Sequence, residues 1–168
     1  MAGREPRPNE ILADIDPAQM EPSAGLVYIG HVRSPWTDRA DCPKNMVQAR
    51  ERQKTAEVLV DPAWRSALKG LSRYSHAILL VWLDQSERNL VIQNPAHADQ
   101  PTGTFSLRSP VRPNPIGLEF VQLLEIDEKN GVIKVDAVDC LDNTPLIDIK
   151  PYFSSTDAIP EATKSGKK

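Results

Sequence analysis

Proline is spread along the whole chain, and this limits what the chain can fold into. Fifteen of the 168 residues are proline, which is nearly twice the usual share of about 5%. Because proline lacks a backbone N–H and disrupts the interior of a helix, long helices fit only into the gaps between prolines. We therefore expect helix to be a minor component and short strands to form most of the fold.

Short apolar segments bounded by polar or turn residues predict these strands. Residues 77–83 form the longest apolar run and are typical of a strand buried on both faces. The Asn130-Gly131 pair predicts a hairpin turn, which would join a strand over 116–126 to one over 132–138. Further strands are expected at 26–32, 56–60, 90–92, 103–107 and 146–149.

Helical signals are few. Over residues 61–70, Asp61 can cap a helix, Pro62 suits its first position and Gly70 can end it. The charged stretch 45–54 is compatible with a second short helix. Together the elements indicate an all-β or β-dominated fold, a small barrel or sandwich with one or two short helices.

The chain is expected to form one domain with loose ends. Residues 1–25 combine four prolines with charges and predict a flexible N-terminal arm, residues 26–153 form the domain, and the small, polar residues 154–168 predict a loosely ordered tail. No apolar run approaches the roughly 20 residues that cross a bilayer. With no apolar leader segment either, the sequence predicts a cytoplasmic protein without a membrane span.

The sequence lacks the motifs of several common enzyme classes. No GxGxxG, P-loop, GxSxG or HExxH pattern is present, and Cys42 and Cys140 are too far apart for a zinc knuckle or a CxxC redox pair. A net charge of −3 argues against a non-specific nucleic-acid coat but leaves room for a local basic patch. A metal-dependent hydrolase built from His76, Asp84 and Asp142 is a minor alternative without ligand spacing to support it.

The most unusual stretch is residues 108–117, with the sequence RSPVRPNPIG. Its three prolines hold the chain extended, so the segment would lose little entropy on binding. Arg108 and Arg112 can then meet a carboxylate or phosphate in a fixed geometry. A strand connection that only covers a sheet edge is an equally good interpretation.

A second polar stretch covers residues 139–152. Three acids, a threonine and a lysine surround a turn at Asp142-Asn143, and such groups can accept hydrogen bonds from an amine or a ribose. Because Asp and Asn are common in turns for the sake of their own backbone hydrogen bonds, a purely structural role is the stronger interpretation from composition alone.

Taken together, five ordered segments resemble the TrmO/TsaA-like family. They are IGHVRSP at 29–35, GLSRYSH at 70–76, GTFSLRSP at 103–110, RPNPIG at 112–117 and DCLDNTPLIDIKPY at 139–152. The resemblance spans roughly residues 26–153 and is closest to short VirR-like members without a C-terminal extension. It implies a small β-barrel methyltransferase that uses S-adenosyl-L-methionine and forms a homodimer. It also implies the methyl acceptor, the base nitrogen N6 of threonylcarbamoyladenosine beside the tRNA anticodon.

The resemblance also implies the site residues. The expected cofactor contacts are Pro43, Lys44, Asn45, Asp84, Gln85, Arg108, Leu118, Leu141, Asp142, Asn143 and Thr144. Asp139 or Asp148 would be catalytic, orienting the amine and taking its proton late in the transfer. Arg112 and Lys150 would remain for tRNA phosphates, and no metal is expected.

The sequence departs from the family pattern in three places. Lys44 or Asn45 stands where glutamine is frequent, Asn143 stands where glycine is usual, and the C-terminal extension of longer relatives is absent. Asparagine tolerates the left-handed backbone that glycine would allow, so Asn143 is compatible with the turn. Two alternatives stay open: a methyltransferase of the same fold with a different, small acceptor, and a non-catalytic RNA- or nucleotide-binding barrel that uses Arg108 and Arg112.

Overall fold

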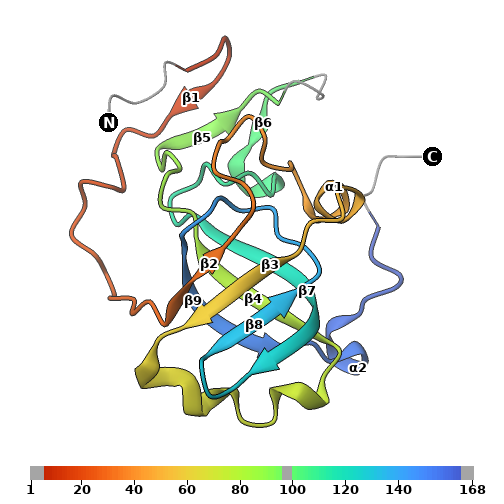
Figure 1. Cartoon of the computed structure of the whole chain (residues 1–168). Coiled ribbons are helices and arrows are strands. Elements are labelled where there is room, and N and C mark those ends of the chain that lie inside the picture. Colours follow the sequence, from red (N-terminus) through yellow and green to blue (C-terminus); the bar gives the residue numbers. More distant parts are fainter. Residues whose placement is uncertain (1–5, 96–99, 164–168) are drawn as a thin grey trace.

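Six antiparallel strands close into a barrel in the computed structural model, which describes residues 6–95 and 100–163 (Figure 1). In order around the barrel the strands are β2 (Gly30–Arg33), β3 (Ala56–Val60), β8 (Val132–Val135), β7 (Ile116–Asp127), β4 (His76–Trp82) and β9 (Thr144–Pro151). The prediction of a β-dominated fold with a small barrel is confirmed.

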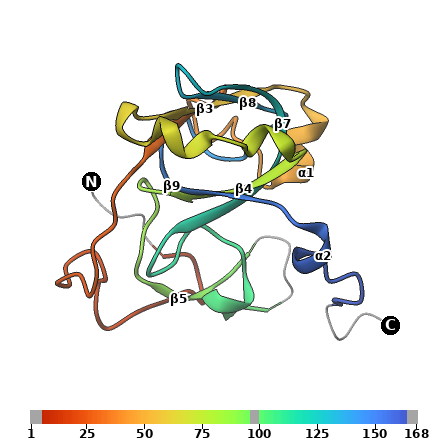
Figure 2. The same cartoon turned by 90° about the horizontal axis from the view of Figure 1, so that it is seen from below.

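A second, smaller sheet lies beside the barrel. It is formed by β1 (Ile11–Leu12), β5 (Leu90–Gln93) and β6 (Thr102–Gly103). In Figure 2, β4 and β9 lie between β5 and the opposite barrel wall of β3 and β8. β1 belongs to the segment predicted as a flexible arm, and it pairs antiparallel with β5.

The helices are short, as the proline distribution predicts. They are α1 (Met46–Glu51) and α2 (Ser154–Asp157), with 3₁₀ turns at Pro62–Leu68, Leu71–Arg73 and Thr104–Ser106. The helix expected over 61–70 is thus a 3₁₀ helix, in which Trp64 N–H donates to the Asp61 carbonyl three residues earlier.

The strand expected over 103–107 is wrong beyond Gly103. The Thr104 hydroxyl donates to the Leu90 carbonyl at 2.7 Å, and Gln93 Nε2 donates to the same hydroxyl at 3.0 Å. These buried contacts draw Thr104 toward β5 and turn the chain into a 3₁₀ turn. Tertiary hydrogen bonds therefore override the extended preference of the sequence.

Alternation along the strands fills the barrel interior with side chains. In β4 the inward residues Ala77, Leu79 and Val81 are fully buried, whereas Ile78 and Leu80 are only partly buried. The expectation that this strand is buried on both faces is wrong, because the outer face of a barrel strand is not part of the core. Inward residues of the other strands complete the core.

Two glycines are required by close backbone approaches. At Gly30, a Cβ would lie 1.9 Å from the Leu59 carbonyl oxygen, so only glycine allows β2 and β3 to pair here. Gly131 has φ +73 in the turn between β7 and β8, which confirms the hairpin predicted at Asn130-Gly131. Within residues 6–95 and 100–163, no helix has the length and apolar character needed to cross a membrane.

Candidate functional site

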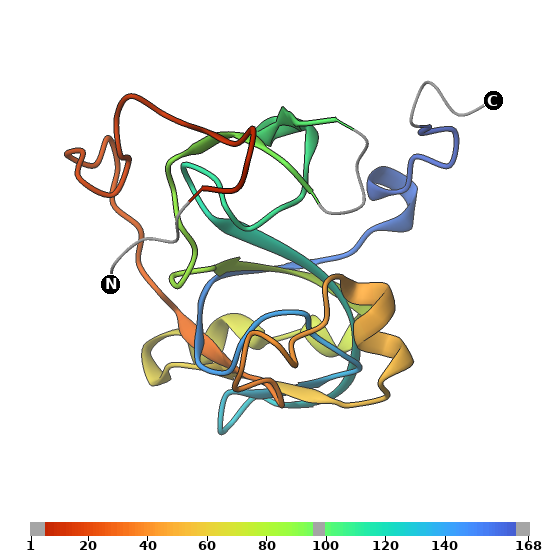
Figure 3. The ribbon, with the colours of Figure 1, turned by 90° about the horizontal axis from the view of Figure 1, so that it is seen from above.

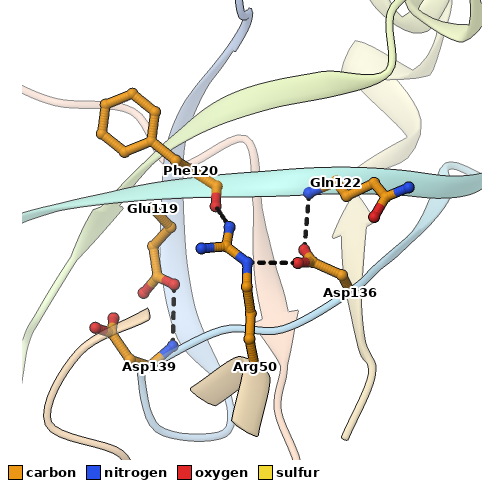
Figure 4. A network of polar contacts seen from close by, with 6 residues as sticks. All are labelled: Arg50, Glu119, Phe120, Gln122, Asp136 and Asp139. Carbon is orange, nitrogen blue, oxygen red and sulfur yellow. Dashed lines mark hydrogen bonds and ion pairs between the residues drawn. The ribbon is translucent and has the colours of Figure 1, made fainter. Parts of the chain in front are cut away.

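The strand β7 is longer than its neighbour β8, and side chains fill the difference. β8 pairs only with residues 123–127 of β7 and ends at Val135. The next residue, Asp136, accepts a hydrogen bond from Gln122 N–H at 2.7 Å. We call the gap between residues 118–122 of β7 and the segment 136–139 the β7 seam; it is drawn in Figure 4.

Two arginines bridge the β7 seam. Arg50 of α1 donates from Nε to Asp136 Oδ2 at 2.8 Å and from Nη2 to the Phe120 carbonyl at 2.5 Å (Figure 4). Arg108 donates to the Leu118 carbonyl, two residues earlier on the same edge, at 3.3 Å. The proline-rich segment predicted from the sequence therefore contacts the seam through Arg108.

A pair of carboxyl groups lies in the same seam. Glu119 points from β7 toward Asp139 (Figure 4) and is only 2% exposed. Its Oε2 accepts the Asp139 backbone N–H at 3.0 Å, and the two carboxyl side chains lie within hydrogen-bonding reach of each other. Burial, followed by the adjacent Asp139 charge, raises the pKa of Glu119 to about 8.

The pKa of Asp139 is also raised, and burial is again the main cause. The hydrogen bond from Glu119 and the positive charges of Arg108 and Arg39 act in the opposite direction and favour the ionised form. Because Arg108 acts on Asp139 and also donates to β7, the proline-rich segment and the aspartate-rich segment lie together at the β7 seam.

Both cysteines lie close to this pair. Cys42 Sγ donates to the Asp139 carbonyl at 3.2 Å, and burial raises its pKa to about 11. Burial, together with the negative charge of Glu119, raises the pKa of Cys140 well above its ordinary value. Both thiols therefore stay protonated at neutral pH and pack as structural groups.

The loop between β2 and α1 is tied to the aspartate-rich segment by hydrogen bonds that span more than 100 residues. Ser34 N–H donates to Asp142 Oδ1 at 2.9 Å, and Trp36 Nε1 donates to the Val138 carbonyl at 2.9 Å. In return, Asp142 N–H donates to the Trp36 carbonyl at 2.7 Å. Asn143 has φ 63, the left-handed conformation expected for it. The turn is thus held rigidly before any ligand binds.

The residues expected to contact the cofactor fall into two groups. One group lies in the loop before α1 and in the turn that leads into β9, two segments at the end of the barrel that Figure 3 views from above: Pro43, Lys44, Asn45, Leu141, Asp142, Asn143 and Thr144, the first residue of β9. The other lies on or just beyond the outer wall of the barrel: Asp84 and Gln85 after β4, and Leu118 on β7. Arg108 connects the two groups, because it contacts the Leu118 carbonyl and acts on Asp139.

Hydrogen bonds at the start of α1 hold Lys44 and Asn45 of the first group in place. Asn45 caps the helix, accepting the Gln48 N–H at 3.0 Å, and Lys44 N–H donates back to Gln48 Oε1 at 3.0 Å. In the second group, Leu118 is 40% exposed and pairs across the sheet with Leu80. The first group therefore offers polar backbone and side-chain groups, and Leu118 of the second group offers apolar surface.

The two candidate catalytic aspartates lie in different places. Asp139 faces Glu119 in the β7 seam, whereas Asp148 lies on the outer wall as the neighbour of Leu80 on β9. Asp148 Oδ2 forms an ion pair with Lys150 Nζ at 2.6 Å. The structure therefore brings Asp139, but not Asp148, into contact with a second acid.

The candidate phosphate ligands also have partners within the chain. Arg112 donates to the carbonyls of Ser109, Thr104 and Leu107, and so organises the loop before β7. Lys150 is paired with Asp148. Contact of Arg112 and Lys150 with RNA stays a prediction.

The hydrolase alternative has no supporting geometry. His76 begins β4 and Asp84 follows its end, so these two residues are separated by the whole strand, roughly 20 Å at 3.3 Å per residue. In the part of the chain that the structure describes, no group of three or more His, Cys, Asp or Glu residues is placed to hold a metal ion.

Two hollows flank the candidate residues. One, of about 420 Å³, lies beside α2 and is lined by His76, Ala77, Phe120, Tyr152, Asp157, Ala158 and Ile159. The other, of about 510 Å³, is lined by Pro35, Trp36, Thr37, Asp41, Arg52 and Lys54, with Arg52 and Lys54 each 5.0 Å from the centre of the Trp36 ring. Neither hollow is lined by a residue expected to bind the cofactor.

Sequence reasoning missed Glu119, Ser34 and Trp36. Glu119 could have been identified from the sequence. Alternation along the strand 116–126 puts it on the same face as Gly117 and Val121, the face that points into the barrel, where a charged side chain is unusual. Ser34 and Trp36 had none, because their partners lie more than 100 residues away in the sequence.

Arg50 is expected to matter for stability far more than a surface arginine does. Arg50→Ala removes the donor to Asp136 Oδ2, in a side chain that is 18% exposed and keeps only the Gln122 N–H, and it also removes the Arg50 donor to the Phe120 carbonyl. The expected cost is about 1–3 kcal/mol. Arg33→Ala is the matched control: Arg33 pairs with Glu57 at the same 2.8 Å, but the two side chains are 63% and 39% exposed, so the loss should stay below about 1 kcal/mol. Chemical denaturation measures both, and equal losses would contradict a bridging role for Arg50.

Comparison with known proteins places this geometry in a family. Residues 31–158 match the family described as tRNA-methyltransferase O N-terminal domain. The chain is 39% identical over 145 residues to the probable S-adenosyl-L-methionine-binding protein VirR of Rhizobium radiobacter, covering 86% of this chain and 80% of that protein. It is 30% identical to the tRNA (adenine(37)-N6)-methyltransferase of Escherichia coli, covering 82% of this chain and 61% of that enzyme.

A solved structure agrees with both matches. The crystal structure of TrmO from Pseudomonas aeruginosa superposes with a TM-score of 0.67 at 27% identity, covering 87% of this chain and 63% of that chain. This chain thus spans about three-fifths of the length of the E. coli enzyme and of the crystallised protein. The match of residues 31–158 covers every barrel residue except Gly30, the first residue of β2, and includes the β7 seam and the loops tied to it. The chain therefore belongs to the tRNA-methyltransferase O N-terminal domain family.

Proposed function

We propose that this protein is an S-adenosyl-L-methionine-dependent methyltransferase that modifies N6 of the adenosine beside the tRNA anticodon, in its threonylcarbamoyl form. The observation that carries the proposal is the family match over residues 31–158. The name of the E. coli relative supports the reaction and its position in tRNA. The name of VirR supports the cofactor.

The chemistry of the candidate residues fits this cofactor. Its sulfonium centre supplies a transferable methyl group. Asp84 and Asp142 would hold its positively charged amino group and its ribose, and Arg108 its carboxylate. Leu118 and Leu141 offer apolar surface to the adenine. The partial exposure of Leu118 and the exposed guanidinium of Arg108 leave both groups accessible to a ligand.

The chain's own contribution to catalysis would be positioning and proton removal. Holding the acceptor nitrogen in line with the methyl group can lower the barrier by about 7–11 kcal/mol. The acceptor nitrogen must lose its proton as it gains the methyl group. The Asp139 carboxylate is the group we assign to take that proton, because burial raises its pKa and so favours the protonated form that proton transfer produces.

The assembly is part of the same proposal. We propose a homodimer in which the second copy covers the open cofactor surface, where Leu118 is 40% exposed in the single copy. Arg112 and Lys150 would face tRNA phosphates beside this surface. We propose a cytoplasmic location for the same reason, since a tRNA substrate would be met there.

Loss of the Asp142 carboxylate should weaken cofactor binding. Asp142→Ala removes both the acceptor of Ser34 N–H and a proposed ligand group, so we expect calorimetry to show an affinity for S-adenosyl-L-methionine at least about tenfold lower, the equivalent of one charge-assisted hydrogen bond. Asp127→Ala is the control, since Asp127 likewise accepts a backbone N–H, from Asn130, but in the distant β7–β8 turn. Equal affinities in the two variants would remove Asp142 from the site.

The reaction itself is tested with bulk tRNA and methyl-labelled cofactor, followed by digestion to nucleosides. The proposal expects label in N6-methylated threonylcarbamoyladenosine. Label that appears only in small molecules would identify a methyltransferase with a different acceptor. Absence of binding heat below millimolar cofactor, with RNA binding retained, would identify a non-catalytic RNA-binding barrel instead.

A further inference from the structure

We propose that Glu119 is a positioning residue for Asp139: a buried carboxylic acid that donates its proton in a hydrogen bond to the Asp139 carboxylate and fixes its direction and charge state. The proposal rests on the proposed function only where it assigns Asp139 the acceptor's proton. The carboxyl pair itself is a property of the folded chain.

The position of Glu119 in the barrel makes it unusual. Its pairing partner on β4 is Leu79, which is fully buried, and the next inward residue of β7, Val121, is fully buried too. A charged carboxylate in such surroundings needs close compensation. The nearest polar partner is Asp139, through its backbone N–H and its carboxyl group.

The charged groups around the pair indicate which acid holds the proton. Arg108, from the proline-rich segment, and Arg39, from the loop before α1, act on Asp139 and favour its ionised form. The groups next to Glu119 are the Asp139 carboxylate and the Cys140 thiol, neither of which supplies positive charge. Cys42 and Cys140 are themselves protonated. The shared proton therefore belongs to Glu119 and the negative charge to Asp139.

The hydrogen bonds of the pair orient Asp139 for its task. Glu119 Oε2 accepts the Asp139 N–H at 3.0 Å. The protonated carboxyl group would also donate its O–H to the Asp139 carboxylate, so that both the backbone and the side chain of Asp139 are held. During transfer, the methyl group leaves sulfur for nitrogen and the N–H proton moves to the free lone pair of Asp139. The Glu119 proton stays in place, and Asp139 then releases the acquired proton to water.

Substitution by glutamine separates this role from simple packing. The glutamine amide offers the same acceptor to Asp139 N–H and a permanent N–H donor to its carboxylate. Ionised Glu119 would instead repel Asp139 and turn it away, so the wild-type rate should fall above about pH 8, where Glu119 loses its proton. Glu119→Gln should keep the neutral rate within about threefold and lose this alkaline decline.

The test is the pH profile of single-turnover methyl transfer for the wild type, Glu119→Gln and Glu119→Ala, with Glu125→Gln, an exposed position on the same strand, as the control. Glu119→Ala should lose at least about tenfold in kcat while KM for tRNA changes little, because the contact acts on Asp139 and not on RNA. An alkaline decline that persists in Glu119→Gln, or equal activity loss in the Gln and Ala variants, would overturn the proposal.

A second measurement does not depend on activity. Carbon-13 NMR of the side-chain carboxyls should show Glu119 titrating near pH 8, and Asp139→Asn should lower that value because it removes the neighbouring negative charge. A Glu119 signal that titrates in the ordinary range would refute the carboxyl pair. If Glu119 titrates as expected but no tRNA is methylated, the result supports the carboxyl pair and contradicts the proposed function.

Discussion

The free energy of unfolding should fall by roughly 4 kcal/mol between pH 4.5 and pH 8, because Glu119 binds its proton more tightly in the folded protein than in the unfolded chain. The pKa of Glu119 rises from its ordinary value of 4.5 to about 8 on folding. The unfolded chain releases this proton first, so each pH unit in this window favours unfolding. The stability contribution of Glu119 is complete below pH 4.5 and is lost by pH 8.

Denaturant melts across this pH range measure the effect. The side chain of Glu119→Gln cannot ionise, so the stability of this variant should fall much less over the window than that of the wild type and exceed it at pH 8. Asp139 reinforces the wild-type trend, because its pKa is raised as well. Asp127 acts in the opposite direction at lower pH: hydrogen bonds from Asn130 lower its pKa, so its contribution is lost as the pH falls through that value. Parallel stability curves for the wild type and Glu119→Gln would show that the Glu119 proton is not linked to folding.

The barrel could be predicted because its signals are local. Alternation of apolar and polar residues identified most strands, and Asn130-Gly131 marked the hairpin between β7 and β8. The same alternation places Asp148 and Lys150, two residues apart, on one face of β9, where they form their ion pair. These features depend only on neighbours in the sequence.

The β7 seam could not be predicted in the same way. It exists because β8 ends at Val135 while β7 continues, and a difference in strand length has no local signature. Arg50 reaches Phe120 across 70 residues, and Ser34 reaches Asp142 across 108. Composition cannot show whether the guanidinium of Arg112 faces solvent or, as here, three backbone carbonyls.

Asp139→Asn should reduce kcat for methyl transfer by about 10²–10⁴-fold, the range for loss of a general base. Asparagine keeps the size of the side chain and an oxygen that can accept the Glu119 proton, but it cannot take the acceptor's proton. Binding of S-adenosyl-L-methionine should change less than about threefold, because the lost step follows binding. Single-turnover kinetics and calorimetry give the two values separately.

Asp148→Asn is the matched control for this comparison. Asp148 is an aspartate of the same segment 139–152, yet it lies on the outer wall, and its charge is balanced by Lys150 at 2.6 Å. The ion pair holds Asp148 on this wall, away from the β7 seam in which Asp139 faces Glu119. We therefore expect Asp148→Asn to retain kcat within about threefold. If Asp148→Asn instead loses as much activity as Asp139→Asn, proton removal takes place on the outer wall of the barrel, and the β7 seam serves only to hold the barrel closed.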